Sequence, residues 1–123
     1  MITEGIVAWQ LFALKQIEIA ALAHGAVGVR AFGSFAGGTA DGWSDLDALV
    51  IVPDGRVAEF WPNHQWLPGF DADVAATKHW QFRPSDASVI QLLLADGRHL
   101  DVMVVEESRA DERLALLADL RPR

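Results

Sequence analysis

Residues 31–52 read AFGSFAGGTADGWSDLDALVIV, and the fold and the chemistry of this chain are organised around them. An apolar run reaches a tight turn at Gly33 and Ser34. After the ten residues 35–44, a second apolar run begins with Asp45, Leu46 and Asp47. Alternate residues of a strand point to the same side, so we expect Asp45 and Asp47 to present two carboxylates on one face.

Paired carboxylates and a glycine-rich turn each predict a ligand. Two adjacent carboxylates repel each other and lower stability unless a cation lies between them. A glycine-rich turn offers backbone N–H groups to an anion. The pattern therefore predicts a divalent metal ion at the aspartates and a phosphate group at the turn.

Length and composition limit the class of protein. The chain has 123 residues, of which 51% are hydrophobic, and a formal charge of −7. This length predicts one domain, residues 1–123, around a single core. The acidic balance argues against a dedicated nucleic-acid binder and favours a cationic acceptor, a divalent ion or a basic partner. With no cysteine and no apolar run long enough for a membrane span, we expect a cytoplasmic protein.

The spacing of apolar residues predicts a helix over residues 3–23, with His24 and Gly25 as its stop. This helix is apolar nearly all round, apart from a narrow polar strip near Lys15 and Glu18. A helix of this kind is usually covered on more than one side. We therefore expect a partner chain or a second domain against it.

Period-2 patterns and turn residues predict the remaining elements. The predicted strands cover residues 27–32, 45–52, 72–82, 88–95 and 98–105. Asp96 and Gly97 join the last two strands in a hairpin, and the capping-box pattern of Ser108–Asp111 predicts a final helix. Together these elements predict an α+β domain with a mixed, mostly antiparallel sheet and helices packed largely on one face.

The last strand carries a third acidic residue, Asp101, which we expect beside Asp45 and Asp47. Three carboxylates can hold one or two Mg²⁺ ions whose other ligands are water and phosphate oxygens. Gly33 allows the backbone to approach the phosphates closely, and the hydroxyl of Ser34 can donate a hydrogen bond to a phosphate oxygen. The plain alternative for Asp101 is a solvated position on the hairpin.

The apolar-Gly-Ser turn, the ten-residue gap and the Asp-apolar-Asp-apolar run resemble the signature of the DNA polymerase β-like nucleotidyltransferase superfamily. Residues 32–50, FGSFAGGTADGWSDLDALV, are most similar to its small bacterial members, the minimal nucleotidyltransferases and the aminoglycoside or lincosamide adenylyltransferases. The resemblance implies a nucleotidyltransferase fold. It implies that Gly33 and Ser34 bind the triphosphate and that Asp45 and Asp47 bind Mg²⁺. Asp101 would be the third carboxylate, either a metal ligand or the base for the acceptor hydroxyl.

By this resemblance the chain is an enzyme that uses Mg²⁺ to transfer AMP from ATP to a hydroxyl of a small acceptor such as an aminoglycoside. The alternative is an antitoxin that binds or adenylylates a helical partner toxin, and a third possibility is a domain without catalysis. Larger relatives continue into a helical domain that helps to bind the acceptor. Since this chain ends at Arg123, we expect a stand-alone minimal member, a fragment, or a homodimer or complex whose partner completes the site.

Several other residues are weaker candidates. Glu106 and Glu107 are reserve candidates for a base, with ordinary exposed glutamates as the simpler interpretation. Cations that could meet a triphosphate are Arg30, Lys78 and Arg83, each of which could equally be a solvated surface charge. The segment Trp61–Phe70 is either a loop packed over the core or a wall of the acceptor pocket.

Overall fold

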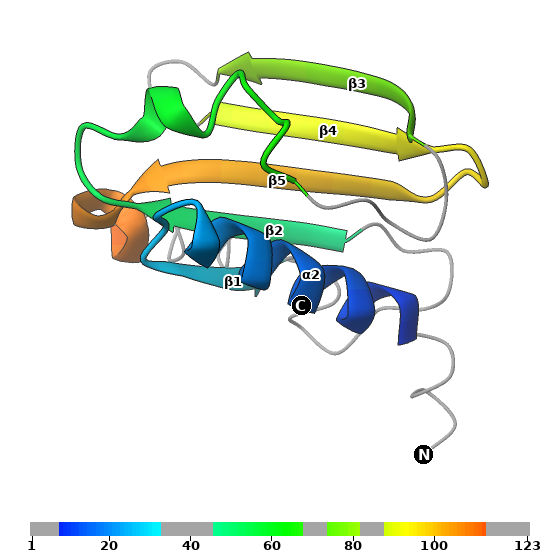
Figure 1. Cartoon of the computed structure of the whole chain (residues 1–123), viewed down its shortest axis with the longest axis horizontal. Coiled ribbons are helices and arrows are strands. Elements are labelled where there is room, and N and C mark those ends of the chain that lie inside the picture. The colour runs from blue at the N-terminus through cyan, green and yellow to red at the C-terminus, as the bar shows by residue number, and fades with distance from the viewer. Residues whose placement is uncertain (1–7, 33–45, 68–73, 82–87, 113–123) are drawn as a thin grey trace.

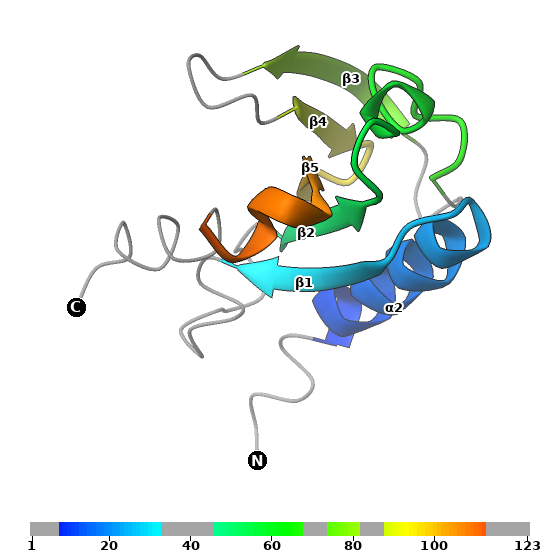
Figure 2. The ribbon, with the colours of Figure 1, turned by 90° about the vertical axis from the view of Figure 1, so that its left-hand side faces the viewer.

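Five strands form one sheet at the centre of the molecule (Figure 1). The computed structural model describes residues 8–32, 46–67, 74–81 and 88–112. The strands are β1 (Gly28–Phe32), β2 (Leu46–Val52), β3 (Val74–Gln81), β4 (Ser88–Leu94) and β5 (His99–Glu106). Their order is β1-β2-β5-β4-β3, which places β1 and β3 at opposite edges (Figure 2).

The sheet is mixed and mostly antiparallel, as predicted. β2 and β5 run parallel to each other, whereas β1 with β2, β4 with β5, and β3 with β4 are antiparallel pairs. β5 is the middle strand and β2 lies beside it, and most residues of these two central strands are buried. Strands covered on both faces read as near-continuous apolar runs, which is the pattern of their sequences.

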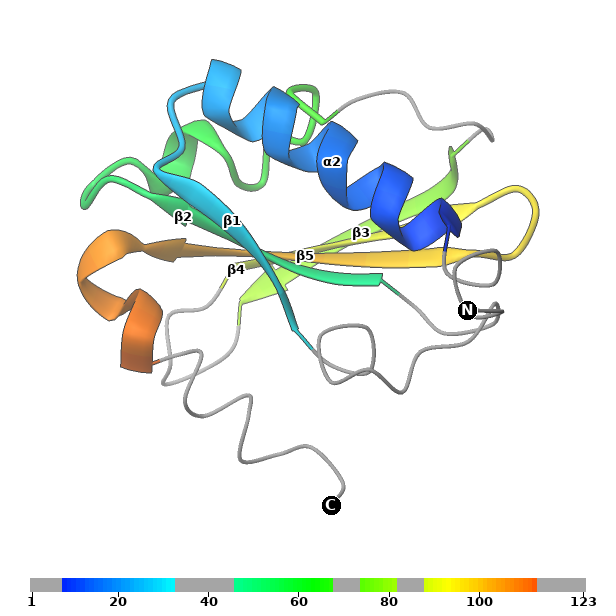
Figure 3. The same cartoon turned by 90° about the horizontal axis from the view of Figure 1, so that it is seen from below.

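The helix α2 (Ala8–Ala23) lies on one face of the sheet, against β1 and β2 (Figures 1 and 3). Its buried side chains are Gln10, Ala13, Ile17 and Ala21, which share one side of the helix. Small alanines in this row let the helix approach the sheet closely. The main core cluster forms between them and the alternate residues of the two central strands that face α2: Leu46, Ala48, Val50, Val52, Leu100, Val102 and Val104.

The opposite face of the sheet carries a second, smaller cluster of buried residues. It consists of Leu49, Ile51, Val89, Met103, Val105 and Ala110. Ala110 follows η2 (Glu107–Arg109), the short turn after β5. Among the described helical segments, α2 thus covers one face, and the chain after β5 turns toward the other.

The predicted stop at His24 and Gly25 ends α2. Gly25 adopts a left-handed backbone with φ of 111°. Its N–H donates to the carbonyl of Leu22 at 3.1 Å, and the N–H of Ala26 donates to the carbonyl of Ala21 at 2.9 Å. These two bonds form a Schellman motif, in which glycine is favoured because it has no Cβ to clash.

The predicted hairpin at Asp96 and Gly97 joins β4 to β5. Gly97 has a φ of 94°, and the N–H of Leu94 donates to the carbonyl of Arg98 at 2.8 Å. The Arg98 guanidinium donates to the Asp96 carboxylate at 2.7 Å and lies 5.0 Å from the ring centroid of Trp9 on α2. This cation–π contact connects the hairpin with the first turns of the helix.

The described part of the segment 61–70 packs over the core. η1 (Val57–Glu59) leads into Phe60, which is 1% exposed, and the indole N–H of Trp61 donates to the carbonyl of Val89 at 2.9 Å. Trp66 packs against the main cluster and donates to the carbonyl of Phe60. Residues 61–67 therefore match the packing interpretation, whereas residues 68–70 lie outside the described part.

In the described ranges, no helix is both long and apolar enough to cross a membrane.

The predicted capping box at Ser108–Asp111 takes a different form. Ser108 lies inside η2 rather than ahead of it, and the residue before this turn, Glu106, makes no side-chain cap. The backbone N–H of Ser108 instead donates to the carboxylate of Asp54 at 3.0 Å. Asp54 is 54 residues away in sequence, so a distant turn supplies the cap.

The end of α2 gives a test of the fold. Replacing Gly25 by alanine should lower the free energy of unfolding by about 1 kcal/mol, because an L-residue at this φ is strained. The matched control is Gly28→Ala, since Gly28 has no left-handed backbone and open space around its Cβ position. Urea unfolding followed by circular dichroism measures both changes. Equal losses for the two variants would contradict the Schellman assignment.

Candidate functional site

Asp47 and Asp101 are directly paired positions on the two central strands. In the parallel register of β2 and β5, the Cα of Asp47 is the partner of the Cα of Asp101. Neighbouring strands lie about 4.8 Å apart, so the two aspartates are immediate neighbours. Both residues are half-buried, whereas all the remaining residues of β2 are buried. The structure therefore brings together two of the carboxylates that the sequence singled out.

The two aspartates lie on the face of the sheet turned away from α2. Alternate residues of a strand share a face. Asp47 is therefore on the same face as Leu49 and Ile51, and Asp101 is on the same face as Met103 and Val105. The apolar side chains of these strands are buried in the second cluster, and the aspartates take the same face near the amino-terminal ends of β2 and β5. This face thus changes from apolar to acidic along two adjacent strands.

A polar row continues from the aspartates toward the edge of the sheet. Gln91 on β4 is the register partner of Asp101, and Lys78 on β3 is the partner of Gln91. On the other side, Phe32 at the end of β1 is the partner of Asp47. Directly opposite residues project from the same face of an antiparallel pair. One line across the sheet therefore carries two acids, an amide and a lysine.

Local sequence patterns do not select Gln91. Its only signal is that a polar residue interrupts the otherwise apolar run VIQLLL, residues 89–94 of β4. Its position beside Asp101 depends on the antiparallel register of β4 and β5, which is set by the hairpin at Asp96 and Gly97. Gln91 can therefore be recognised as a neighbour of Asp101 only when that register is known.

Three of the predicted site residues, Gly33, Ser34 and Asp45, lie outside the described residues. The described strands show where their segment is anchored. β1 ends at Phe32, β2 begins at Leu46, and Phe32 pairs with Asp47. The segment between these strands therefore leaves and re-enters the sheet at the end that carries the two aspartates.

Two carboxylates side by side are donors of the kind that Mg²⁺ prefers, so these residues fit a magnesium ion. Within the described ranges, no group of three His, Cys, Asp or Glu residues is placed to hold a metal. The predicted metal site therefore includes a ligand beyond Asp47 and Asp101, for which the sequence predicts Asp45. The metal roles of all three remain predictions.

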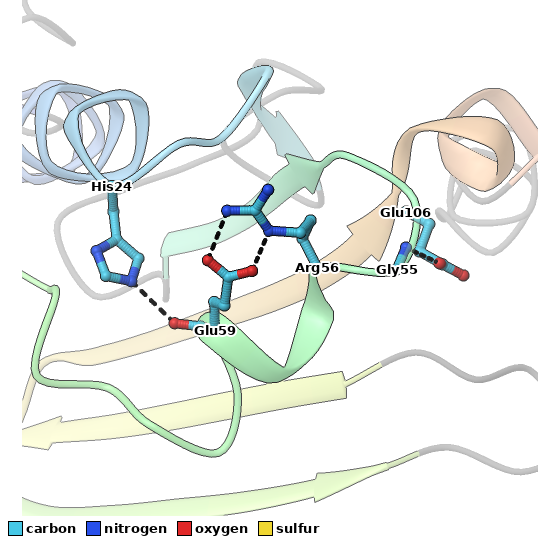
Figure 4. Close-up of polar contacts among 5 residues, drawn as sticks. All are labelled: His24, Gly55, Arg56, Glu59 and Glu106. Atoms are coloured by element: carbon cyan, nitrogen blue, oxygen red, sulfur yellow. Dashed lines mark hydrogen bonds and ion pairs between the residues drawn. The ribbon is translucent and has the colours of Figure 1, made fainter.

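The reserve candidates for a base are not near the aspartates. Glu106 is the register partner of Val52, at the opposite end of β5 from Asp101, and its carboxylate accepts a hydrogen bond from Gly55 N–H at 2.6 Å (Figure 4). Five residues of strand separate it from Asp101 by about 16 Å. Glu107, which follows it, is exposed in η2. Neither residue can act on a group held at Asp47 and Asp101.

The same far end of the sheet holds an exposed ion pair of η1. The Arg56 guanidinium donates two hydrogen bonds to the Glu59 carboxylate, and the carbonyl of Glu59 accepts one from Nε2 of His24 at 2.9 Å (Figure 4). The hydrogen bonds between the two side chains lower the pKa of Glu59 and raise the pKa of Arg56. These charges connect η1 with the end of α2 and are remote from the aspartates.

Of the predicted cations, two fall within the described residues. Arg30 on β1 is the partner of Leu49, two residues along the strand from the position opposite Asp47. Lys78 on β3 is in the same row as Asp47 and Asp101. Both residues are exposed. Arg83 lies outside the described residues.

Comparison with known proteins identifies the family. A family model described as a nucleotidyltransferase domain matches residues 15–120. The chain belongs to this nucleotidyltransferase family. The match includes β2, β5 and both described aspartates. Among curated proteins, none matches the sequence.

Solved structures share the fold of this nucleotidyltransferase domain. A cytoplasmic RNA terminal U-transferase has a TM-score of 0.60 and 21% identity, covering 95% of this chain and 36% of its own. The Cid1 poly(U) polymerase bound to Mg and 3′-dATP has a TM-score of 0.58 and 19% identity, covering 89% of this chain and 34% of its own. The chain spans about a third of the length of these proteins. The family and fold expected from residues 32–50 are confirmed.

The like charges of the aspartate pair give a test by stability. In buffer without divalent ions, Asp47→Asn should raise the free energy of unfolding by up to about 1 kcal/mol, because it removes repulsion between adjacent carboxylates. The control, Asp96→Asn, should leave stability unchanged or slightly lower, because Asp96 pairs with Arg98. Chemical denaturation measures both. A loss of stability in Asp47→Asn would show that this carboxylate stabilises the fold without metal.

Proposed function

We propose that this chain transfers AMP from ATP to a hydroxyl group of a small acceptor in a reaction that requires Mg²⁺. The observation that carries the proposal is the side-by-side placement of Asp47 and Asp101 at the end of the sheet where the segment with Gly33 and Ser34 joins. Membership of the nucleotidyltransferase family supports the class of reaction.

The residues take the following roles in this proposal. Asp47 and Asp101 hold Mg²⁺ together with Asp45, and Gly33 and Ser34 bind the triphosphate. When bound, the metal neutralises charge on the triphosphate and on the departing pyrophosphate. A reaction of this kind depends on positioning and electrostatics, which strands buried on both faces can provide.

The transfer forms one bond and breaks one. The acceptor oxygen attacks the α-phosphorus of ATP, and the bond from that phosphorus to the bridging oxygen of pyrophosphate breaks, with its electron pair leaving on pyrophosphate. The hydroxyl proton passes to a carboxylate or to water. In its alternative role Asp101 is that base in place of being a metal ligand. Glu106 and Glu107 are excluded from this role by their position at the far end of β5.

A cationic acceptor such as an aminoglycoside suits the acidic chain, whose formal charge is −7. Opposite charges steer a ligand toward its site and raise its local concentration. With such an acceptor, the protein would be a cytoplasmic enzyme of antibiotic resistance.

The second candidate is an antitoxin that adenylylates a helical toxin. The exposed apolar side of α2 favours a protein partner.

Incubation with ATP labelled on the α-phosphate, Mg²⁺ and a panel of aminoglycosides, lincosamides and co-purifying proteins tests the function. We expect label on a drug, and its loss when Mg²⁺ is chelated. Label on a protein band would favour the antitoxin. No transfer to any acceptor at any Mg²⁺ concentration would contradict the proposed activity.

The aspartates are tested in the same assay. Asp47→Asn and Asp101→Asn should each lower kcat/KM at least about a hundred-fold, because several kcal/mol of transition-state stabilisation depend on a bound metal. The matched control, Asp96→Asn, makes the same chemical change in an exposed turn and should keep full activity. Normal activity in Asp47→Asn would exclude it as a metal ligand.

A further inference from the structure

The outer side of α2 is apolar and exposed. The four large apolar side chains Leu11, Phe12, Ile19 and Leu22 are 55%, 52%, 63% and 47% exposed. They lie on the opposite side of the helix from the buried row of Ala13, Ile17 and Ala21. Figure 3 shows the sheet on only one side of α2. We call this exposed surface, with Lys15 and Glu18 in its middle, the outer stripe.

The outer stripe has the spacing of a helix–helix seam. Leu11, Lys15, Glu18 and Leu22 are separated by four, three and four residues, which is the alternation of a and d positions in a heptad. Phe12 and Ile19 are seven residues apart and flank this seam on one side. A lone surface helix needs no such regularity on its exposed side, because polar residues normally occupy it.

The charges of the seam define the orientation of a helix packed against it. Lys15 and Glu18 occupy its two central positions, and their side chains approach to 3.7 Å within the chain. A second copy in parallel would oppose lysine to lysine and glutamate to glutamate. In antiparallel orientation Leu11 meets Leu22 of the partner subunit, and Lys15 meets Glu18 of the partner subunit. The four seam positions are thus apolar, basic, acidic and apolar in order. This order is complementary to the same four positions of a second, antiparallel helix.

We propose that the chain forms a two-fold dimer in which the outer stripes of two α2 helices pack antiparallel. A two-fold axis makes each contact occur twice, so both central layers become oppositely charged pairs and both outer layers become leucine pairs. α2 has 16 residues and is about 24 Å long, so a single pair of helices offers a small contact. The dimer is therefore weak and dependent on concentration. The aspartate pair lies on the other face of the sheet, so this contact does not cover it.

Sedimentation equilibrium of the full chain tests the dimer. We expect a monomer–dimer equilibrium that shifts toward monomer in Ile19→Gln, with a dissociation constant raised about tenfold or more. The matched control is Val74→Gln, because Val74 is an apolar residue of similar exposure, 46%, on β3. It should leave the equilibrium unchanged. A monomer at all concentrations would overturn the proposal, as would equal effects of the two substitutions.

A charge exchange isolates the contact between subunits. Lys15→Glu alone and Glu18→Lys alone should each be monomeric, because each variant puts like charges in the central layers. A mixture of the two variants should form a heterodimer, since glutamates at 15 and 18 of one chain then meet lysines at 18 and 15 of the other. The pair within each chain remains repulsive in both variants, so only a contact between chains explains recovery.

Size-exclusion chromatography with light scattering follows the mixture. Circular dichroism shows whether each exposed substitution leaves the helix intact. Failure of two folded variants to associate when mixed would overturn the antiparallel arrangement. A dimer in the single variants equal to that of the unchanged chain would place the contact elsewhere on the surface.

Discussion

The parallel register between β2 and β5 is the constraint on which the rest of the structure depends. It places Asp47 directly beside Asp101 and at the same time aligns their apolar neighbours on both faces. A slip of one residue in either strand would turn its aspartate toward α2 and its core residues toward the opposite face. Because most residues of both strands are buried, that slip would lose most of the core. The packing of apolar residues thus holds two like charges together.

The far end of the same strands shows how the register is supported. Gly55, in the turn after β2, donates to Glu106 at the end of β5, and Asp54 accepts from Ser108 just beyond it. These bonds join the carboxyl ends of the two parallel strands across more than fifty residues of sequence. They lie at the opposite end of the strands from the aspartates, where we propose the ligand site. Structural carboxylates and candidate catalytic carboxylates are therefore separated along the strands.

Much of this arrangement could be predicted from local sequence patterns. The stop of α2 at Gly25, the hairpin at Asp96 and Gly97, and the acidic start of β2 each depend on a few neighbouring residues. The place of Asp101 beside the acidic start of β2 was expected from the sequence, and the parallel pairing of β5 with β2 confirms it for Asp47. Gln91 could not be recognised in this way, because its place beside Asp101 depends on cross-strand register. Glu106 was a candidate because it is close to Asp101 in sequence, but an extended strand carries it to the other end of the sheet.

The central claim is that Asp47 and Asp101 together hold a divalent cation. Paramagnetic broadening of backbone amide signals by Mn²⁺, in the presence of nucleotide, tests it directly. Signals of Ala48 and Val102, next to the aspartates, should disappear at the lowest Mn²⁺ concentrations, while those of Val52 and Glu106 at the far end should persist. Broadening that begins at Val52 and Glu106, or affects all four residues equally, would contradict a cation site at the aspartate pair.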